Sequence, residues 1–335
     1  FGRSPEHAAI NPDNLEILLA HLKCAAFELP LRDGELFGRH ETDDLCRFLE
    51  ETGFLHHSGG AWHWTSDSYP ADATSLRSVS SDNFVVVDIT GEPAVIADVA
   101  FTAALTSLHE KAIYLHEARQ YHVERFDYQE RKAYVRRVDC DYYTDAIDYT
   151  EVKALEEFEG EALAGARRAH GDVRVNRQIV GFKKIKFYTN ENVGAGKLSM
   201  PEQEMHTTAF WLHFPVDFLA RLTEYTPTEE ESGIAGLANA LRTVAALLLM
   251  CDPHDLGVGR SQEPNLYLYD AYPGGIGLAA PLYRLAPQLL RQTAQLIAGC
   301  GCDNGCPACV GPTGEIGERG KEVAARILAE LCAES

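Results

Sequence analysis

The spacing of hydrophobic residues over positions 13–78 predicts two helices. In the first, apolar residues recur every three to four positions, at 15, 18, 19 and 22, behind an Asp-Asn cap signal. The second helix is expected to begin behind Thr42, with Leu45, Phe48 and Leu49 on its apolar face. Both patterns are typical of amphipathic helices that pack one face against a core.

The pattern then changes to an alternation typical of a β-hairpin. The stretch GFLHHSGGAWHWTS, residues 53–66, contains the turn Ser58-Gly59-Gly60 and places Trp62 and Trp64 on one face. Two helices followed by a short aromatic hairpin indicate a winged-helix module. A generic helical cap on a neighbouring domain explains the same pattern, so both interpretations stay open here.

Residues 82–198 are rich in short β-branched or aromatic runs separated by turns. The runs are NFVVVDI, AIYL, YHVERFD, KAYVRRVDC and QIVGFKKIKFYT. This pattern predicts a barrel or a strongly twisted sheet.

The pattern over residues 201–335 becomes largely helical. Its longest apolar run, GIAGLANALRTVAALLLM at 233–250, is close to the length of a membrane span, but Asn239 and Arg242 interrupt it. Its many Ala and Gly residues suit a helix packed tightly inside protein. We therefore expect a core helix and no membrane partner.

These segments together define the expected architecture. The chain has 335 residues, 45% of them hydrophobic, which suits two or three domains with cores of their own. We expect an α+β protein with a winged-helix-like domain at 13–80, a β-rich barrel-like domain at 81–200 and a mainly helical domain at 201–335. Residues 1–12 show neither an initiator Met nor a signal-peptide pattern and are interpreted as the tail of a preceding domain.

The net charge and the cysteine content bear on nucleic-acid binding and on the cellular compartment. The formal net charge of −20 argues against a surface that binds nucleic acid all over, although a local basic channel stays compatible with it. The chain has nine cysteines, an odd number, and its start carries no secretory signal. A reducing, cytoplasmic location is therefore expected, where clustered cysteines serve more often as metal ligands than as disulfides.

Four cysteines form the strongest chemical signal. Cys300, Cys302, Cys306 and Cys309 have the form C-x-C-x₃-C-x₂-C, and Gly301, Gly305 and Pro307 allow tight turns between them. Thiolates at such separations can surround one tetrahedral ion, and four ligands leave no open position. We predict a structural Zn²⁺ site in the C-terminal domain. An iron–sulfur cluster, disulfides and a redox site are the alternatives.

Cations on the predicted strands are the best candidates for DNA binding. GFKKIKFYT, residues 181–189, contains Lys183, Lys184 and Lys186 among aromatic residues, and RKAYVRR, residues 131–137, contributes Arg136 and Arg137. Interleaved cations and rings suit a groove that follows a nucleic-acid backbone. A sheet edge protected by solvated lysines explains the same residues.

Three further motifs have ordinary structural explanations. ENVGAGKLSM contains Gly196-Lys197 but lacks the spacing of a phosphate loop, so no ATP site is expected. The glycines of YDAYPGGIGLA, 269–279, could hold an anion, although close packing with Asp270 as a cap is the preferred interpretation. Isolated His and Asp residues beside helix starts are usually caps or satisfied polar groups, although in principle they could build a hydrolytic metal site. They are His206, His254, Asp252, Asp255 and Asp270.

Several strings together resemble one family. They are HLKCAAFELPL, HEKAIYLHEARQYHVERFD, VDCDYYTDAI, GFKKIKFYTNENVGAGKL, PEQEMHTTAFWL, CDPHDLG, YDAYPGGIG and the terminal C-x-C-x₃-C-P-x-C. The chain resembles superfamily 2 DEAD/DEAH-box DNA helicases of the mitomycin repair factor A type, over the region that follows the motor. The resemblance implies 3′-to-5′ DNA unwinding in repair, driven by ATP and Mg²⁺ bound in two RecA-like lobes upstream. It also implies a winged-helix domain and a zinc domain, whose ligands fall on the same four cysteines.

We therefore expect the accessory C-terminal region of an ATP-dependent DNA helicase. Its partners would be DNA, single-stranded or 3′-tailed, and the RecA-like lobes of the same polypeptide. Alone it should hydrolyse nothing and bind DNA weakly or not at all. A protein-interaction platform of a helicase-related phage-defence complex is the main alternative, and a standalone metal hydrolase that uses His206 or His254 is a third.

Overall fold

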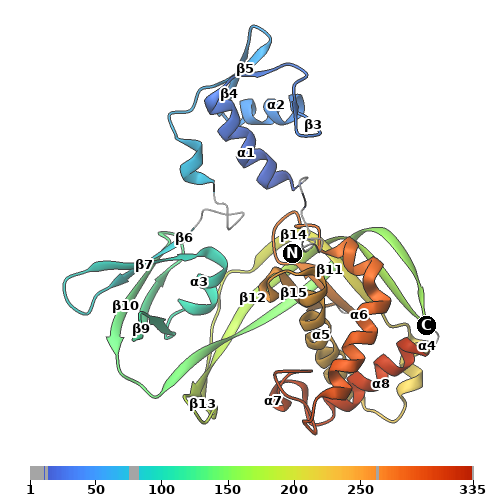
Figure 1. Ribbon diagram of the computed structural model, residues 1–335. Helices are drawn as coiled ribbons and strands as arrows, with labels where there is room; N and C mark the ends of the chain where they lie inside the picture. The colour runs from blue at the N-terminus through green and yellow to red at the C-terminus, as the bar shows by residue number, and fades with distance from the viewer. Residues whose placement is uncertain (1–10, 12–13, 75–82, 262–263, 334–335) are drawn as a thin grey trace, which may run out of the picture. The chain divides into compact units, whose positions relative to one another are not determined.

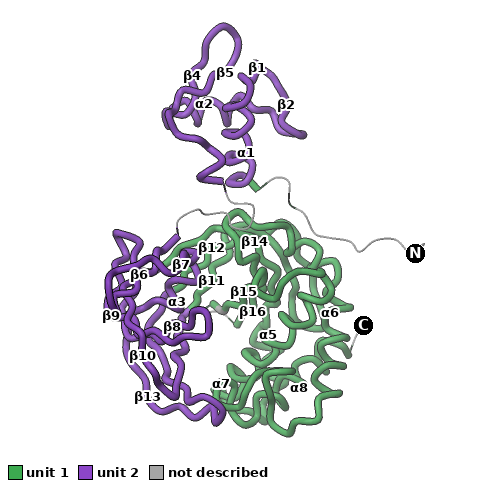
Figure 2. Tube along the Cα trace, turned by 60° about the vertical axis from the view of Figure 1, so that its left-hand side comes forward, with its two compact units in different colours: residues 1–14, 150–177, 203–335 green, residues 15–149, 178–202 purple. Residues whose placement is uncertain are grey.

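A computed structural model describes residues 11, 14–74, 83–261 and 264–333. The chain divides into two compact units, coloured separately in Figure 2. One consists of residues 1–14, 150–177 and 203–335, and the other of residues 15–149 and 178–202. Most of the expected tail at 1–12 lies outside the described residues.

The two helices and the hairpin of the winged-helix module form where the sequence predicts them. Its elements are α1 (Leu15–Glu28), β1 (Leu31–Arg32), β2 (Leu36–Phe37), β3 (His40–Glu41), α2 (Asp43–Glu51), β4 (Leu55–Ser58), β5 (Ala61–Trp64) and the 3₁₀ turn η1 (Pro70–Ala73). Strands β4 and β5 form the hairpin, and β1 pairs with β5 to complete a three-stranded sheet. The hairpin turns at Gly59 and Gly60, whose φ angles of 63° and 78° favour glycine.

Two details of this module differ from expectation. The sequence pattern puts Phe48 on the buried face of α2, but its side chain is 50% exposed, whereas Cys46 and Leu49 are fully buried. Helix α2 packs on the core of the module through Cys46 and Leu49, because residues three positions apart lie on the same face of a helix. Thr42 stands at the start of α2, but its hydroxyl donates to the Glu35 carbonyl oxygen (2.9 Å) and does not cap the helix.

A five-stranded mixed sheet follows. Its elements are β6 (Asn83–Asp88), β7 (Ala94–Ala100), α3 (Phe101–Ser107), β8 (Ile113–His116), β9 (Arg119–Asp127) and β10 (Lys132–Val138). The strand order is β7-β6-β10-β9-β8, with β6 and β10 parallel. Phe84, Val86, Val123 and Val135 are fully buried in its core.

The second sheet has six strands and is nearly closed. Its strands are β11 (Tyr142–Leu163), β12 (Ala166–Lys186), β13 (Asn192–Lys197), β14 (Gln203–His213), β15 (Leu256–Arg260) and β16 (Asn265–Asp270). They follow the order β11-β15-β16-β14-β12-β13, and β11 also pairs with β12. The glycine-rich segment that lacks phosphate-loop spacing is strand β13. Three strands come from the region expected to be mainly helical.

Helices pack against this sheet in the cysteine-containing unit, where Figure 1 shows α5, α6 and α8 together. The helical elements are α4 (Val216–Leu219), η2 (Ala220–Leu222), α5 (Pro227–Leu249), η3 (Pro253–Asp255), α6 (Ala279–Gly299), α7 (Thr313–Ile316) and α8 (Gly320–Cys332). Their largest buried side chains include Phe218, Leu222, Leu237 and Leu241.

Helix α5 is the central helix of this core. It is long and apolar enough to span a membrane by length and composition, yet 61% of its apolar window is buried inside the protein. Thr226 begins the helix with a capping box, in which its hydroxyl accepts from the Glu229 N–H and the Glu229 carboxylate accepts from the Thr226 N–H. The apolar surface of α5 packs into the hydrophobic core through Leu237, Leu241 and Val244.

Candidate metal centre and nucleic-acid surface

The four predicted cysteines converge on one point. Cys300 directly follows α6, and its sulfur lies 3.6 Å from that of Cys302 and 3.5 Å from that of Cys306. The Cys309 sulfur lies 3.5 Å from that of Cys302 and 3.7 Å from that of Cys306. Four sulfurs at about 2.3 Å from a tetrahedral zinc are roughly 3.8 Å apart. The observed spacing therefore fits one tetrahedral ion.

The distances between the four sulfurs also argue against disulfides and an iron–sulfur cluster. Bonded disulfide sulfurs are about 2.0 Å apart, so these thiols are not disulfide-linked, and all nine cysteines are free. A multi-iron cluster would hold its ligand sulfurs further apart, because each sulfur binds a different iron. All four ligand atoms here lie within 4.8 Å of one another. The arrangement suits a single ion.

The backbone makes this convergence possible at a glycine. Gly305 has a φ of 131°, and a Cβ there would come within 2.8 Å of the Gly311 carbonyl oxygen. The Cys306 carbonyl oxygen accepts from the N–H groups of Cys309 and Gly311, both at 3.0 Å, which closes the turn between the last two ligands. Gly301, by contrast, has open space around it, so the site does not depend on glycine there.

The thiols of the cluster differ in acidity. Burial raises the pKa of the Cys309 thiol to about 11. Burial also opposes ionisation of Cys302, but hydrogen bonds from the other cluster thiols and from Lys321 outweigh it and lower the pKa of Cys302 to about 7. A metal binds thiolate, not thiol. Cys302 therefore offers a thiolate at neutral pH more readily than Cys309 does.

The other cysteines stand apart from this cluster. Within the described ranges, the four clustered cysteines are the one group of three or more His, Cys, Asp or Glu ligands close enough to share an ion. Cys251, near the end of α5, is not among them, and burial raises the pKa of its thiol to about 11.

The residues considered for a hydrolytic site serve other purposes. His254 is 97% exposed and pairs with Asp252 at 2.7 Å inside the cap of a 3₁₀ turn. The Asp255 carboxylate accepts from the Tyr272 hydroxyl at 2.8 Å, and His206 lies at the surface beside Glu204. These groups form no shared ligand set.

Asp270 organises the glycine turn. One oxygen of its fully buried carboxylate accepts the backbone N–H groups of Ile276, Gly277 and Leu278, at 2.8, 2.9 and 3.1 Å. The N–H of Gly274 donates to the His206 carbonyl oxygen at 2.8 Å. Because the protein itself accepts from these N–H groups, the hydrogen bonds agree with the packing and capping interpretation preferred from the sequence.

The five predicted DNA-binding cations lie on two strands of one unit. Arg136 and Arg137 are exposed on β10, and Arg136 has a long contact of 3.9 Å with Glu124. At the end of β12, the Lys184 ammonium lies 4.8 Å from the centre of the Tyr142 ring, and Lys186 pairs with Asp141 at 3.6 Å. Lys183 alternates with them along the strand.

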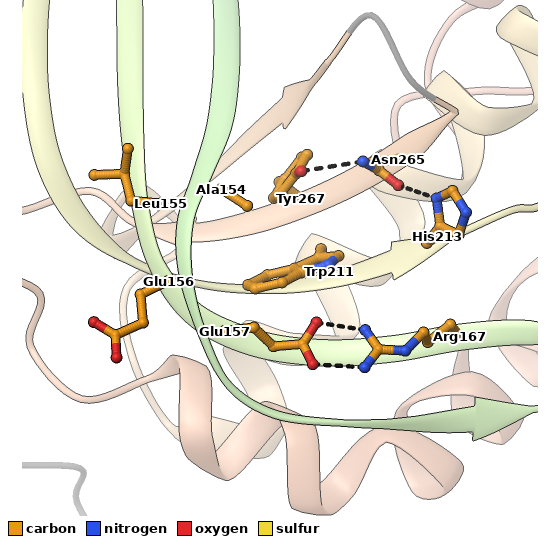
Figure 3. A pocket seen from close by; sticks show the side chains of 9 residues that line it. All are labelled: Ala154, Leu155, Glu156, Glu157, Arg167, Trp211, His213, Asn265 and Tyr267. Atoms are coloured by element: carbon orange, nitrogen blue, oxygen red, sulfur yellow. Dashed lines mark hydrogen bonds and ion pairs between the residues drawn. The ribbon is translucent and has the colours of Figure 1, made fainter.

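A pocket that sequence reasoning missed lies in the nearly closed sheet (Figure 3). Its volume is about 350 Å³, and Trp211 and Tyr267 line it with residues of β11. The polar groups around it pair with one another: His213 with Asn265 at 2.6 Å, Asn265 with the Tyr267 hydroxyl at 3.1 Å, and Arg167 with Glu157. Alternate positions of β14 and β16 point inward, which is the one sequence signal that could have indicated it.

Comparison with known proteins identifies the class of domains. Residues 10–79 match the winged-helix domain of the ATP-dependent helicase HRQ1, and residues 237–310 match the MrfA Zn-binding domain. The second match contains all four clustered cysteines. The chain therefore combines an HRQ1-type winged-helix domain with an MrfA-type zinc-binding domain, and the generic helical cap is ruled out.

Individual relatives agree with these domains. The ATP-dependent helicase YprA of Bacillus subtilis is 40% identical over 346 residues, which cover 99% of this chain and 45% of YprA. HRQ1 of Saccharomyces cerevisiae is 25% identical over 325 residues, 89% of this chain and 29% of HRQ1. The chain thus spans less than half the length of either helicase.

Solved structures show the same relationship. A crystal structure of the DUF1998 helicase MrfA matches with a TM-score of 0.66 and 36% identity, over 96% of this chain and 45% of MrfA. A structure of MrfA bound to DNA matches with a TM-score of 0.56 and 41% identity, over 98% of this chain and 44% of MrfA. The chain is therefore similar, over nearly its whole length, to less than half of the helicase MrfA.

Proposed function

We propose that this chain is the accessory C-terminal region of an ATP-dependent 3′-to-5′ DNA helicase that acts in cytoplasmic DNA repair. The region would bind DNA and assist strand separation, while RecA-like lobes of the same polypeptide bind ATP and Mg²⁺. The likeness to MrfA, a helicase solved with DNA, supports this proposal over nearly the whole chain.

The cysteine cluster carries the structural half of the proposal. Cys300, Cys302, Cys306 and Cys309 would hold one Zn²⁺, because their sulfur spacing fits a tetrahedral ion inside a segment that matches a zinc-binding domain. The ion would supply cross-linking and no chemistry, since four thiolates fill its coordination positions. It would fix the loop between α6 and α8 against the helical core.

Metal analysis of protein purified without added metal tests this role. We expect one zinc per chain and little iron. Cys306→Ser should lose the zinc and destabilise the helical core, because binding energy at a structural site is folding energy. Cys332→Ser, at the end of α8 and outside the cluster, is the control and should keep the metal. Stoichiometric iron with visible absorption would contradict the assignment.

The cations of β10 and β12 carry the DNA-binding half. We propose that Lys183, Lys184, Lys186, Arg136 and Arg137 contact the phosphates of a single strand or a 3′ tail. The ring of Tyr142 beside Lys184 provides the aromatic partner typical of such grooves. Phosphate contacts carry no base information, so binding through them should not depend on sequence.

Removing charges in the longer protein that includes the RecA-like lobes tests the proposed DNA binding. Lys183→Ala with Arg137→Ala should weaken DNA binding equally for unrelated sequences. It should also make the salt dependence shallower, by about 0.7 units of log–log slope for each phosphate of the single strand that the protein no longer neutralises. Arg47→Ala with Arg326→Ala removes as many exposed cations elsewhere and should do much less. Equal weakening by both pairs would show a general charge effect and refute a binding path.

The acidic charge of the winged-helix domain suggests a second role for this chain, in binding protein. Residues 15–74 contain 11 Asp and Glu against 4 Lys and Arg, and the hairpin from Leu55 to Trp64 has no Lys or Arg. On α2, the single Arg47 pairs with Asp44 at 2.8 Å. DNA phosphates are repelled by such a surface. We therefore propose that this domain contacts protein, and that replacing Asp44 and Glu51 with Ala will not weaken DNA binding.

A further inference from the structure

Lys321 makes an unusual set of contacts with the cysteine loop. Its ammonium donates to the carbonyl oxygens of Cys300 (2.8 Å) and Cys302, and it lies 3.4 Å from the Cys302 sulfur. An ammonium has three N–H donors. Each donor therefore has an acceptor in the loop that begins the metal site, and none of these acceptors is a carboxylate.

The position of Lys321 makes these contacts informative. Lys321 lies in the first turn of α8, a 13-residue helix, where the positive end of the helix dipole disfavours a cation. Within the described part of the chain, no carboxylate pairs with this ammonium. Its neighbour Arg319, by contrast, pairs with Glu229 and Glu322. The ammonium of Lys321 therefore interacts with the cysteine loop, residues 300–309, and not with a carboxylate.

A thiolate site has a reason to attract such a group. Four thiolates around a divalent ion carry a net charge of about −2. Hydrogen bonds from outside the ligands orient them and reduce that charge, and their loss typically weakens metal binding by about 10- to 100-fold. An N–H donor aimed at one ligand sulfur, on a side chain that also holds the carbonyls of two ligands, meets both requirements.

We propose that Lys321 is a positioning residue of the metal centre, which orients Cys300 and Cys302 and offsets the negative charge of the four thiolates. The inference rests on the proposed zinc site. Asn239 of α5 provides a related contact, because its amide donates to the Val310 carbonyl oxygen at 3.2 Å. Lys321 differs from Asn239 because it carries charge and reaches a ligand sulfur.

Zinc release to an excess of a chromogenic chelator tests the proposal. Lys321→Met keeps the stem but removes the charge and the donors, and it should release zinc about tenfold faster than the wild type or more. Lys321→Arg keeps the charge and should lie between them. Arg326→Met is the matched control on the same helix, because Arg326 pairs with Glu224 and Glu330 and not with the loop. It should release zinc at the wild-type rate.

A spectroscopic readout separates positioning from general stability. With Co²⁺ in the site, loss of the hydrogen bond to the Cys302 sulfur should move the thiolate-to-cobalt charge-transfer band to lower energy in Lys321→Met, and leave it in place in Arg326→Met. If the Met variant does not fold, Lys321→Gln is measured against the same criteria.

Two results would overturn the proposal for Lys321 alone. One is wild-type zinc release and an unmoved cobalt band in Lys321→Met. The other is equal acceleration of release in Lys321→Met and Arg326→Met, which would mean that α8 is merely destabilised. A wild-type protein that holds no zinc would instead overturn the zinc site itself, and Lys321 with it.

Discussion

The close approach of α5 and α8 makes Gly233 a sensitive position. A Cβ built there would lie 2.2 Å from Val323 Cγ1, 2.5 Å from Val323 Cβ and 3.3 Å from the Ala324 nitrogen. Favourable carbon–carbon contacts are near 3.5–4.0 Å, and a β-branched side chain in a helix has little freedom to rotate away. Gly233→Ala should therefore force the two helices apart.

The expected magnitude follows from two opposing effects. Alanine in a helix interior gains about 1 kcal/mol over glycine. Overpacking a tight core costs about 1–3 kcal/mol, and the severity of the contact with Val323 favours the upper end. We expect Gly233→Ala to lower the free energy of unfolding of this unit by about 2 kcal/mol. That corresponds to a fall of roughly 4–8 °C in Tm for a unit of this size.

Urea unfolding followed by Trp211 fluorescence, with the winged-helix tryptophans replaced by Phe, measures this unit. Gly299→Ala is the control, because Gly299 ends α6 with no atom within 4 Å of its Cβ position, and it should leave stability unchanged or slightly raised. In Gly233→Ala/Val323→Ala the smaller neighbour should relieve the clash, so that the combined loss of stability falls below the sum of the two single effects by about 1–2 kcal/mol. Additive effects, or a Gly233→Ala protein as stable as the control, would refute the packing argument.

Three further outcomes are expected. Thr226→Ala removes the capping box of α5 and should cost about 1 kcal/mol in urea unfolding. The hydrogen bond from Arg167 holds the pKa of Glu157 below its ordinary value of 4.5, so the stability from this pair is present above that value and is lost as pH falls through the lower folded pKa. The difference in stability between wild type and Glu157→Gln, no more than about 1 kcal/mol, should therefore be visible at pH 6 and vanish in the acid range. Residues 1–335 alone should show no ATPase activity with or without DNA, and turnover that persists through repurification would contradict this.

Local signals explain what the sequence predicted well. Three features depend on residues that are close together in the sequence. They are the Gly59-Gly60 turn, the helix that contains Leu22 and the cluster from Cys300 to Cys309. Their conformation is set by turn chemistry and short-range packing. These features could be placed by residue number before any tertiary contact was known.

Long-range pairing explains what the sequence did not reveal. Strand β11 was not predicted, because its stretch EVKALEEFEGEAL is rich in helix-favouring Glu, Ala and Leu, and pairing with β12 overrides that propensity. Lys321 and Asn239 reach the cysteine loop from 19 and 71 residues away, so no spacing rule connects them. The exposure of Phe48 was mispredicted because helical periodicity alone does not say where the buried stripe ends.

Strand β12 has a consequence for anyone who expresses pieces of this protein. Residues 167–177 of this strand pair with β14 in one unit, and its last residues pair with β13 in the other. A fragment that ends near residue 200 would therefore keep β12 but lack β14, leaving eleven residues of strand without their ladder partner. Unpaired edges of that length associate with each other, so such a fragment should aggregate. Soluble pieces would have to keep both partners of this strand.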